Sequence, residues 1–579
     1  MIKVENMSYM FPQKDLFNKI SFTLETGNHC ALIGTSGSGK STLIDILMNP
    51  DNYMYDGTLE MDPNCRIGYV SQFTQMDNFK ATTVFDYIAE EFIQLQNQIT
   101  AVCTAMETAT DIEPLLEEYQ ETLDAFNAID GDNFENNINK KLGLADLGNH
   151  KNSIIAELSG GEFKLIQVIK EMLHAPELMI MDEPDVFLDF DNLNSLKHLI
   201  NSHKGMVLIV THNRYLLNNC FNKIIHLENM ELQEFDGGYV EYNFSLLLEK
   251  IELQELSVAD DEEIERNQVI IDNLRKIASL NTEASRGRAL KARVKIQERL
   301  QARRIKAPFV DIKQPNIRLT TRNIIEETTA LEVNDLNMAF DESLLEHVNF
   351  DIGSTDKVAI IGANGTGKTT LLREIFKNQN DAIKVHEDIE LAYLSQLQGE
   401  VLDESNTVLQ EFFDAGFKTT EDIRTYLRGY GFGEKVLRQK IGVLSGGEKN
   451  ILQLAKVSVS NANLLLLDEP TSHLDTYAQI ALEKAISNYE GAILMISHDY
   501  YSIVNSMDYV FIIENKTIRK MSMRKFRKMI YANYFDKDYL QIEQQKKEVE
   551  TKIAMALKNY DFELAKVLSE KLEAIIELL

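Results

Sequence analysis

Two glycine-rich segments have the residue types and spacing of phosphate-binding loops. Each fits G-x-x-x-x-G-K-[ST], follows a short apolar run (HCALI or KVAII) and precedes a helical stretch, so main-chain N–H groups and a helix start can cradle phosphates. Lys40 and Lys368 would reach the β and γ phosphates, while Ser41 and Thr369 would hold Mg²⁺. A chance glycine-rich turn explains one copy, but not two in the same register. The predicted phosphate-binding residues are Gly34, Thr35, Ser36, Gly37, Ser38, Gly39, Lys40, Ser41 and Thr42, and Gly362, Ala363, Asn364, Gly365, Thr366, Gly367, Lys368, Thr369 and Thr370.

A pair of carboxylates follows a second apolar run in each half. Asp182-Glu183 ends ELMIM and Asp468-Glu469 ends NLLLL. The first carboxylate of each pair can organise Mg²⁺, and the second can orient or activate water for in-line attack on a phosphate. Adjacent acids after a strand are more often a helix start or a solvated loop. Their register with the phosphate loops favours the catalytic interpretation.

A third motif, LSGGE, occurs once in each half directly before a helical stretch. Exposed amides at a helix start can bind an anion, so these segments are candidates for a second phosphate contact. The residues are Ser159, Gly160, Gly161 and Glu162, and Ser445, Gly446, Gly447 and Glu448.

The order of these motifs reveals an internal repeat. Lys40 and Lys368 are 328 residues apart and Gln72 and Gln396 are 324 apart, whereas Ser159 and Ser445 are 286 apart, so the first half carries a net insertion of 38 residues. Residues 86–135 are the predicted insertion, a helical hairpin arm without glycine over most of its length. Elsewhere apolar runs alternate with helical stretches, which predicts an α/β fold with a mostly parallel sheet in each half.

The combined motifs resemble the ATP-binding-cassette superfamily, and the match covers both halves. In that superfamily two cassettes meet head to tail and ATP lies between the phosphate loop of one and the LSGG segment of the other. The resemblance implies that residues 445–447 complete the site of Lys40 and that residues 159–161 complete the site of Lys368. ATP and Mg²⁺ are the implied substrate and cofactor, and the chain is expected to be an ATPase.

The resemblance also assigns roles to individual residues. The implied catalytic residues are Glu183, Glu469, His212 in VTH and His498 in ISH. The implied Mg²⁺ site residues are Ser41, Gln72, Asp182, Thr369, Gln396 and Asp468. Phe11 and Phe340 resemble the aromatic residue that stacks on adenine, although a buried core phenylalanine is an equally good explanation for both.

The first half departs from the superfamily pattern after its glutamate. Asp185-Val186-Phe187-Leu188-Asp189 stands where the second half has Thr471-Ser472-His473-Leu474-Asp475, and Asn213 corresponds to Asp499. Phe163 likewise corresponds to Lys449. We therefore hypothesise that the two sites turn over ATP at unequal rates.

The segment between the halves, about 244–320, begins acidic and becomes basic. A solvated helix face is the usual explanation of a charge run, but this one lies in a chain of net charge −31 and carries nine cations in 21 residues, which favours contact with phosphodiester backbone. A helix–turn–helix hairpin with its tip at ASLNTEAS fits the pattern. The RNA-contact candidates are Arg286, Arg288, Lys291, Arg293, Lys295, Arg299, Arg303 and Arg304.

Tandem cassettes without a membrane span, with an inserted arm and a charged linker, resemble the ABC-F family. That family includes ribosome-bound translation factors and proteins that protect ribosomes from antibiotics. The resemblance implies a ribosome partner, with rRNA and peptidyl-tRNA contacted by the linker near the tRNA exit site and the arm facing the L1 stalk. The arm is acidic, which favours protein contact or an exposed face. An antibiotic-resistance protein of the same family that protects the ribosome is the nearest alternative function. An ATPase subunit of a transporter and a DNA-repair ATPase are alternatives from other classes.

We divide the chain into four regions: cassette 1 (1–243), charged helical linker (244–320), cassette 2 (321–537) and a C-terminal helical hairpin or coiled coil (538–579). The last region has a weak resemblance to the UVR interaction motif, and a simple packing hairpin is the main alternative. The start of the chain lacks a signal-peptide pattern, so we expect a cytoplasmic protein, monomeric with its two cassettes paired.

Overall fold

The structure is a computed structural model, and it forms two compact units. The first contains Met1–Asp236 and Lys313–Ile530, and the second contains Gly237–Ile312 and Tyr531–Leu579. The four-region division of the sequence stays a prediction. The structure describes residues 1–11, 14–63, 65–72, 76–79, 81–109, 111–186, 188–280, 293–295, 314–321, 328–339, 343–535 and 539–578.

The first cassette is built on a six-stranded sheet whose strands are mostly parallel. The apolar runs that end in the sequence motifs form its buried central strands. Five strands are parallel, and β9 pairs antiparallel with β8 at one edge. In spatial order the strands are β5 (Ile67–Val70), β6 (Leu178–Asp182), β7 (Met206–Val210), β3 (His29–Ile33), β8 (Lys223–Glu228) and β9 (Glu231–Asp236).

A second, three-stranded antiparallel sheet completes the core of this cassette. Its strands are β2 (Lys14–Leu24), β1 (Ile2–Phe11) and β4 (Asp56–Glu60). Its apolar side chains join those of the central sheet and of α1 (Lys40–Met48) in one buried cluster. No motif in the sequence predicts this sheet.

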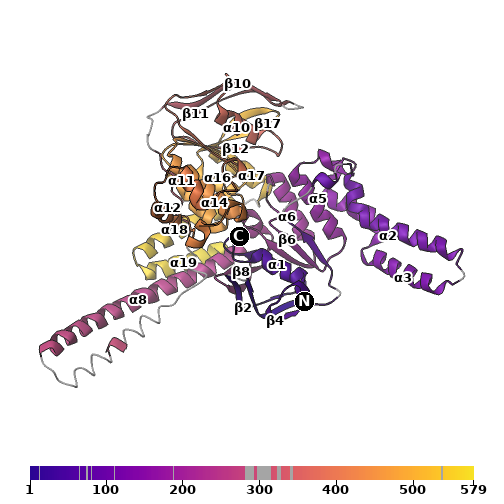
Figure 1. Ribbon diagram of the computed structural model, residues 1–579, viewed down its shortest axis with the longest axis horizontal. Helices are drawn as coiled ribbons and strands as arrows, with labels where there is room; N and C mark the ends of the chain where they lie inside the picture. The colour runs from indigo at the N-terminus through magenta and orange to yellow at the C-terminus, as the bar shows by residue number, and fades with distance from the viewer. Residues whose placement is uncertain are drawn as a thin grey trace. The chain divides into compact units, whose positions relative to one another are not determined.

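The predicted arm is an antiparallel pair of helices, α2 (Val84–Met106) and α3 (Glu113–Ala128), which lie side by side in Figure 1. Thr83 caps α2 by accepting the Asp86 N–H. The base of the arm packs against α4 (Phe134–Leu144), where Phe92 stacks on Phe134 with ring centroids 5.1 Å apart.

Three further helices carry the site motifs of the first cassette. They are α5 (Gly160–Leu173), α6 (Phe190–Ser202) and α7 (Arg214–Asn219). Each begins at a side-chain cap, provided by Ser159, Asp189 and Asn213 respectively.

The second cassette repeats this architecture. Its central sheet has the order β14 (Leu391–Leu394), β15 (Leu464–Asp468), β16 (Ala492–Ile496), β12 (Lys357–Ile361), β17 (Tyr509–Glu514) and β18 (Thr517–Ser522). Its small sheet has the order β11 (Ser343–Gly353), β10 (Thr329–Ala339) and β13 (Ile383–Val385). Its helices are α10 (Lys368–Lys377), α11 (Val408–Asp414), α12 (Thr420–Gly429), α13 (Glu434–Leu437), α14 (Gly446–Ser460), α15 (Thr476–Asn488), α16 (Tyr500–Ser506) and α17 (Met523–Tyr534). The predicted fold class of two α/β cassettes is confirmed.

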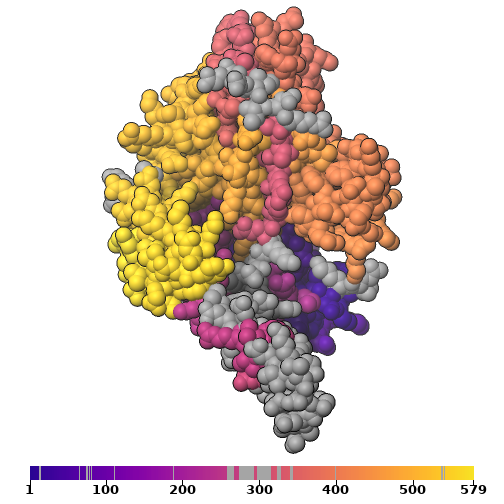
Figure 2. Space-filling model, turned by 90° about the vertical axis from the view of Figure 1, so that its left-hand side faces the viewer, coloured from indigo at the N-terminus to yellow at the C-terminus, as the bar shows by residue number. Residues whose placement is uncertain are grey.

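The second unit is helical. The long helix α8 (Tyr239–Leu280) packs through Ile251 against the hairpin of α18 (Tyr539–Lys558) and α19 (Phe562–Ile576), which is yellow in Figure 2. Within the described part of the linker, Asn267 exchanges hydrogen bonds of 3.2 and 3.4 Å with the carbonyl and guanidinium of Arg293, so the chain returns alongside α8 at this point. None of the described helices is both long and apolar enough to cross a membrane.

Candidate functional sites

The first phosphate loop turns tightly between β3 and α1. Gly34 has a φ of +152°, and a Cβ there would lie 2.1 Å from the carbonyl oxygen of Leu227, so only glycine fits. The Lys40 ammonium donates to the carbonyls of Gly34 and Thr35 at 2.8 and 3.1 Å. Burial lowers the pKa of Lys40, and nearby carboxylates such as Glu183 partly oppose that effect. The loop thus holds a desolvated cation at the start of a helix, as a phosphate site requires.

The second phosphate loop has the same local geometry between β12 and α10. Lys368 donates to the carbonyls of Gly362 and Ala363, both at 2.8 Å. The Thr369 hydroxyl donates to Asp468 at 3.3 Å. The structure therefore brings together the loop and the carboxylate that the sequence placed in separate motifs.

Each phosphate loop contacts the opposite cassette. At the first loop, the hydroxyls of Ser36 and Ser445 lie 3.2 Å apart, and the Ser36 N–H donates to Asp475 at 3.3 Å. A Cβ on Gly447 would lie 3.1 Å from the Ser36 hydroxyl oxygen. The first loop and the second LSGGE segment therefore face each other across the cassette boundary.

The reciprocal arrangement occurs at the second loop. The Asn364 N–H donates to Asp189 at 3.0 Å, and a Cβ on Gly161 would lie 3.3 Å from the Asn364 side-chain nitrogen. A cleft of about 450 Å³ opens here, which is within the usual range for a ligand site. It is lined by Ser159, Gly160 and Gly161 from the first cassette and by residues that include Gly365, Lys368, Thr369, Thr370, Gln396, Asp468, Glu469 and His498 from the second.

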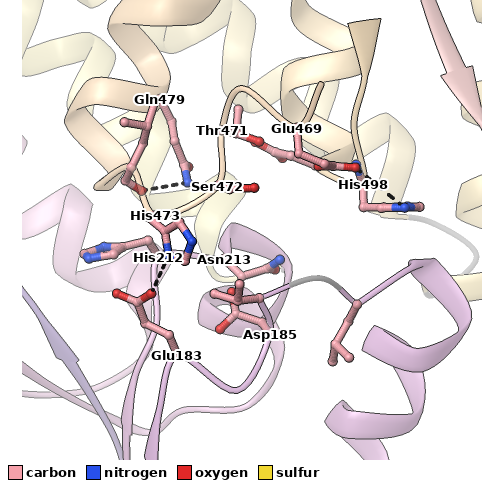
Figure 3. Close-up of a pocket in the computed structure, with 14 residues that line it drawn as sticks. Glu183, Asp185, His212, Asn213, Glu469, Thr471, Ser472, His473, Gln479 and His498 are labelled. Atoms are coloured by element: carbon pink, nitrogen blue, oxygen red, sulfur yellow. Dashed lines mark hydrogen bonds and ion pairs between the residues drawn. The ribbon is translucent and has the colours of Figure 1, made fainter. Parts of the chain in front are cut away.

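Glu183 lies where side chains from both cassettes meet. It has a left-handed backbone (φ 46°), and its N–H bonds the Val210 carbonyl at 2.9 Å. Its carboxylate accepts from the Gln72 amide at 2.6 Å and lies 3.2 Å from Nδ1 of His473, which comes from the second cassette (Figure 3). Burial alone would raise the pKa of Glu183, but the His473 hydrogen bond and neighbouring positive charge hold it below its usual value. Burial lowers the pKa of the adjacent His212 to about 4, so this imidazole is neutral at pH 7.

Glu469 has a different environment at the second site. Its carboxylate accepts from the main-chain N–H of His498 at 3.4 Å, and the ring atom Nε2 of the same histidine lies 3.6 Å from the other carboxylate oxygen. Burial, followed by repulsion from Asp468, raises the pKa of Glu469 to about 8. Burial lowers the pKa of His498 to about 3, so it supplies no opposing charge. Both glutamates line a small cavity of about 70 Å³ at the cassette boundary, which Figure 3 shows.

The residues at both sites fit a magnesium ion. Hydroxyl and carboxylate oxygens are the hard ligands that Mg²⁺ prefers, and Ser41 pairs with Asp182 as Thr369 does with Asp468. Burial raises the pKa of Asp182 to about 6, a cost that a bound cation would offset. Among the described residues no group of three or more His, Cys, Asp or Glu forms a metal-binding cluster.

The remaining ligand predictions stay untested. Phe11 ends β1, is 48% exposed and lies edge-on to Tyr9 with ring centroids 5.6 Å apart. Phe340 lies outside the described residues, as do Arg286, Arg288, Lys291, Arg299, Arg303 and Arg304. Arg293 and Lys295 are described, and both are exposed.

Sequence reasoning missed Lys164, a buried lysine in α5. Its ammonium donates to the carbonyls of Ser71 and Gln72 at 2.5 and 2.9 Å, and burial lowers its pKa to about 8. It therefore anchors the loop that delivers Gln72 to Glu183. The signal in the sequence was a lysine within the otherwise apolar run FKLI.

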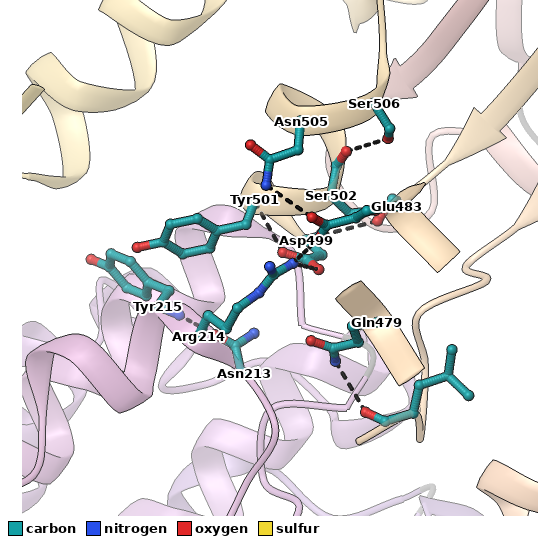
Figure 4. Close-up of polar contacts among 12 residues, drawn as sticks. Asn213, Arg214, Tyr215, Gln479, Glu483, Asp499, Tyr501, Ser502, Asn505 and Ser506 are labelled. Atoms are coloured by element: carbon teal, nitrogen blue, oxygen red, sulfur yellow. Dashed lines mark hydrogen bonds and ion pairs between the residues drawn. The ribbon is translucent and has the colours of Figure 1, made fainter. Parts of the chain in front are cut away.

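Three residues that join the cassettes were also missed. Asp189 and Asp475 look in the sequence like ordinary helix caps, and they do cap α6 and α15, but their second oxygens bond the opposite phosphate loops. Arg214 extends from α7 to Glu483 and Asp499 of the second cassette, with the Asp499 contact at 2.8 Å (Figure 4). These contacts depend on cassette pairing, which a single half does not encode.

The regions of the chain that match known proteins contain the same motifs. The family model described as "ABC transporter" matches residues 17–186 and 345–472. The chain is 31% identical over 518 residues to the uncharacterized ABC transporter ATP-binding protein YfmM of Bacillus subtilis (strain 168), covering 86% of this chain and 96% of that protein. It is 28% identical to ABC transporter F family member 5 of Arabidopsis thaliana, covering 89% and 75%. It is 27% identical to the energy-dependent translational throttle protein EttA of Haemophilus influenzae, covering 84% and 87%.

A solved structure supports the fold. The complex of an archaeal ribosomal stalk protein, aP1, with the archaeal ribosome recycling factor aABCE1 contains a chain that matches with a TM-score of 0.53 at 18% identity, covering 91% of this chain and 92% of that one. This protein is therefore an ATPase with two nucleotide-binding cassettes, and it belongs to the ABC-F family of ATP-binding-cassette proteins.

Proposed function

We propose that this chain is a cytoplasmic, ribosome-binding ATPase that hydrolyses ATP at two intercassette sites to time its release from the ribosome near the tRNA exit site. The observation that carries the proposal is that each phosphate loop lies against the LSGGE segment of the other cassette. A nucleotide held on both sides would stabilise the paired cassettes, and loss of its γ-phosphate would weaken that pairing. The similarity to a protein named as a translational throttle supports translation as the process concerned.

Different side chains have different roles in ATP hydrolysis. Lys40 and Lys368 would bind phosphate oxygens, and the LSGGE serines Ser159 and Ser445 would contact the nucleotide from the opposite cassette. Glu183 would orient the attacking water and accept its proton, with Glu469 in the same role at the second site. Gln72, Gln396, His212 and His498 line these positions. Mg²⁺, held by the hydroxyl and carboxylate pairs, would neutralise phosphate charge.

The basic linker supplies the contact with nucleic acid in this proposal. The nine cations between residues 286 and 306 contrast with the net charge of −31, so the field that attracts RNA is confined to one segment. Pairing of the cassettes would then change how this segment faces the RNA that it contacts. We expect the linker to contact rRNA and peptidyl-tRNA.

The test uses a hydrolysis-blocked protein. The Glu183→Gln, Glu469→Gln variant is mixed with 70S ribosomes and ATP and centrifuged through a sucrose gradient. Co-sedimentation with ATP that is lost with ADP is the expected result, because the paired state is trapped. Replacing Arg286, Arg288 and Arg293 by Gln should reduce this binding and weaken its dependence on salt.

One control is needed to interpret the sedimentation result. A nucleotide-binding assay must show that the blocked protein retains ATP, since a protein without ATP would also stay at the top of the gradient. If it holds ATP and still fails to sediment with ribosomes, the ribosomal proposal is wrong. Retention on membranes or on branched DNA would then support the transporter or DNA-repair alternatives.

A further inference from the structure

Two polar side chains converge on one carboxylate oxygen of the first site. The Gln72 amide nitrogen lies 2.6 Å from Oε2 of Glu183, and Nδ1 of His473 lies 3.2 Å from the same oxygen and 3.2 Å from the Gln72 nitrogen. Gln72 and Glu183 belong to the first cassette, and His473 comes from the second. Figure 3 shows the His473 ring and the Glu183 carboxylate pointing toward each other from opposite cassettes. The histidine side chain is 14% exposed and the glutamate 18%, so water screens the contact only weakly.

The backbone of the second cassette fixes His473 in this position. His473 has a left-handed φ of 59°, a conformation that is sterically unfavourable for a non-glycine residue. Asn450 donates to the carbonyls of Pro470 and Ser472 at 3.2 and 2.8 Å, and Gln479 donates to the carbonyl of Leu474 at 3.1 Å. The backbone is thus tied on both sides of the histidine, which offsets the cost and aims the ring out of its own cassette.

The two cassettes differ in chemistry at this position. In the repeat, His473 corresponds to Phe187, which lies outside the described residues. A phenyl ring has no nitrogen, so it can neither donate a hydrogen bond to a carboxylate nor accept one from an amide. Whatever its position, Phe187 cannot make at the second site the contact that His473 makes at the first.

We infer that His473 is a positioning residue that the second cassette supplies in trans to the first ATP site, where it fixes the Glu183 carboxylate relative to the Gln72 amide. Because the contact exists only when the cassettes are paired, it makes Glu183-dependent hydrolysis conditional on pairing. The first site therefore has a polar link to its partner cassette that the second site lacks. The inference depends on the ATPase activity and not on the proposed ribosomal partner.

The test measures single-turnover ATP hydrolysis in proteins with one working site. The Glu469→Gln background leaves the first site active, and the Glu183→Gln background leaves the second. Two substitutions of His473 are compared in each. His473→Phe introduces the residue that the first cassette already carries at this position, and it retains bulk without nitrogen. His473→Asn is smaller but keeps an amide nitrogen near the Nδ1 position.

In the Glu469→Gln background we expect His473→Phe to slow hydrolysis about 10- to 100-fold, because a misplaced reacting group usually has an effect of this size. We expect the rate of His473→Asn to stay within about three-fold of the parent protein. In the Glu183→Gln background both variants should change the rate by less than about three-fold. Equal losses for Phe and Asn, or equal losses in the two backgrounds, would overturn the inference in favour of a packing or pairing defect. An unchanged rate for His473→Phe would overturn it as well. Ribosome sedimentation is scored separately, so failure of the ribosomal proposal would leave this result intact.

Discussion

Replacing Arg214 is expected to weaken cassette pairing by several kcal/mol. Its guanidinium bonds Glu483 and Asp499 of the other cassette, and it lies over the Tyr501 ring with 5.0 Å to the centroid. The side chains of Arg214, Glu483 and Asp499 are 12%, 9% and 15% exposed. Burial opposes the charge of Arg214, but the two carboxylates outweigh it and raise the pKa of the guanidinium. The network is therefore a charged and buried contact between the two cassettes.

The expected loss of pairing free energy follows from the two buried carboxylates that Arg214→Met leaves without their arginine partner. Removing one partner of a buried ion pair costs about 3–5 kcal/mol, because the remaining charge stays desolvated. Here Glu483 keeps a bond from Asn505 at 2.9 Å and Asp499 keeps the Tyr501 N–H at 3.0 Å, so we expect the lower end of that range. A loss of about 3 kcal/mol corresponds to roughly a 100-fold change in the pairing equilibrium.

Fluorescence energy transfer between two dyes, one on each cassette, measures cassette pairing. One dye is attached to the exposed Cys103 of the first cassette and the other to a cysteine introduced at the exposed Glu421 of the second, in the hydrolysis-blocked background. If ATP binding and pairing are coupled, Arg214→Met should raise the ATP concentration for half-maximal pairing by up to about 100-fold. Arg214→Lys should give an intermediate value, since it keeps the charge but loses the planar fork.

A compensating variant distinguishes a buried-charge penalty from a general packing loss. Arg214→Met combined with Glu483→Gln and Asp499→Asn removes all three charges, and Asn at position 499 can still cap its helix as Asn213 does in the first cassette. This triple variant should recover most of the lost pairing. Equal half-saturation for the parent and Arg214→Met, or a triple variant weaker than the single one, would refute the reasoning.

Three further perturbations have defined expectations. Gly447→Ala should weaken pairing at the first site, because its Cβ would lie 3.1 Å from the Ser36 hydroxyl oxygen of the first cassette and 2.6 Å from the His473 carbonyl oxygen of its own cassette. Gly433→Ala, outside the nucleotide sites and with no atom within 4 Å, should pair normally in the same energy-transfer assay. Burial lowers the pKa of His226 to about 3, so this side chain stays neutral in the folded protein, and its contribution to stability is complete above about pH 6.5 and is lost as the pH falls. Between pH 7.5 and 5 the free energy of unfolding in urea should fall by about 2 kcal/mol more for the wild type than for His226→Gln. Equal decreases for the two proteins would contradict this pKa. Ile553→Ala in the C-terminal hairpin should lower the local free energy of unfolding of residues 539–576, measured by hydrogen exchange, by about 2–5 kcal/mol, because Ile553 is buried. The matched variant Met555→Ala changes a side chain that is 61% exposed, so it should alter this free energy by no more than about 0.5 kcal/mol.

The parts of the molecule that the sequence predicted well are those determined by short stretches of chain. A strand followed by G-x-x-x-x-G-K-[ST] and a helix can form almost only one turn, since Gly34 leaves no space for a side chain beside Leu227. The arm was predicted because helix periodicity and an offset between the repeats agreed on the same residues. The small antiparallel sheet was missed because its strands carry no motif, and Asp56–Glu60 joins the sheet only by tertiary pairing with β1.

The contacts between cassettes were beyond the reach of motif analysis for a physical reason. Asp189 has the ordinary pattern of a helix cap, and its first oxygen satisfies that pattern within its own cassette. Its second oxygen bonds Asn364, 175 residues further along the chain, and nothing in the local sequence specifies that partner. A side chain can therefore satisfy a local rule and also carry the interface.

The positions at which the two halves differ nevertheless indicated where to look. His473 replaces the Phe187 of the first repeat, Asp499 replaces Asn213, and Tyr500 stands where the first repeat has Arg214. In the described part of the structure His473, Asp499 and Arg214 all reach across the cassette boundary. We therefore expect that exchanging the segments 185–189 and 471–475 between the cassettes would transfer the effect of the histidine from the first ATP site to the second. An unchanged ratio of the two hydrolysis rates after the exchange would show that any asymmetry arises elsewhere.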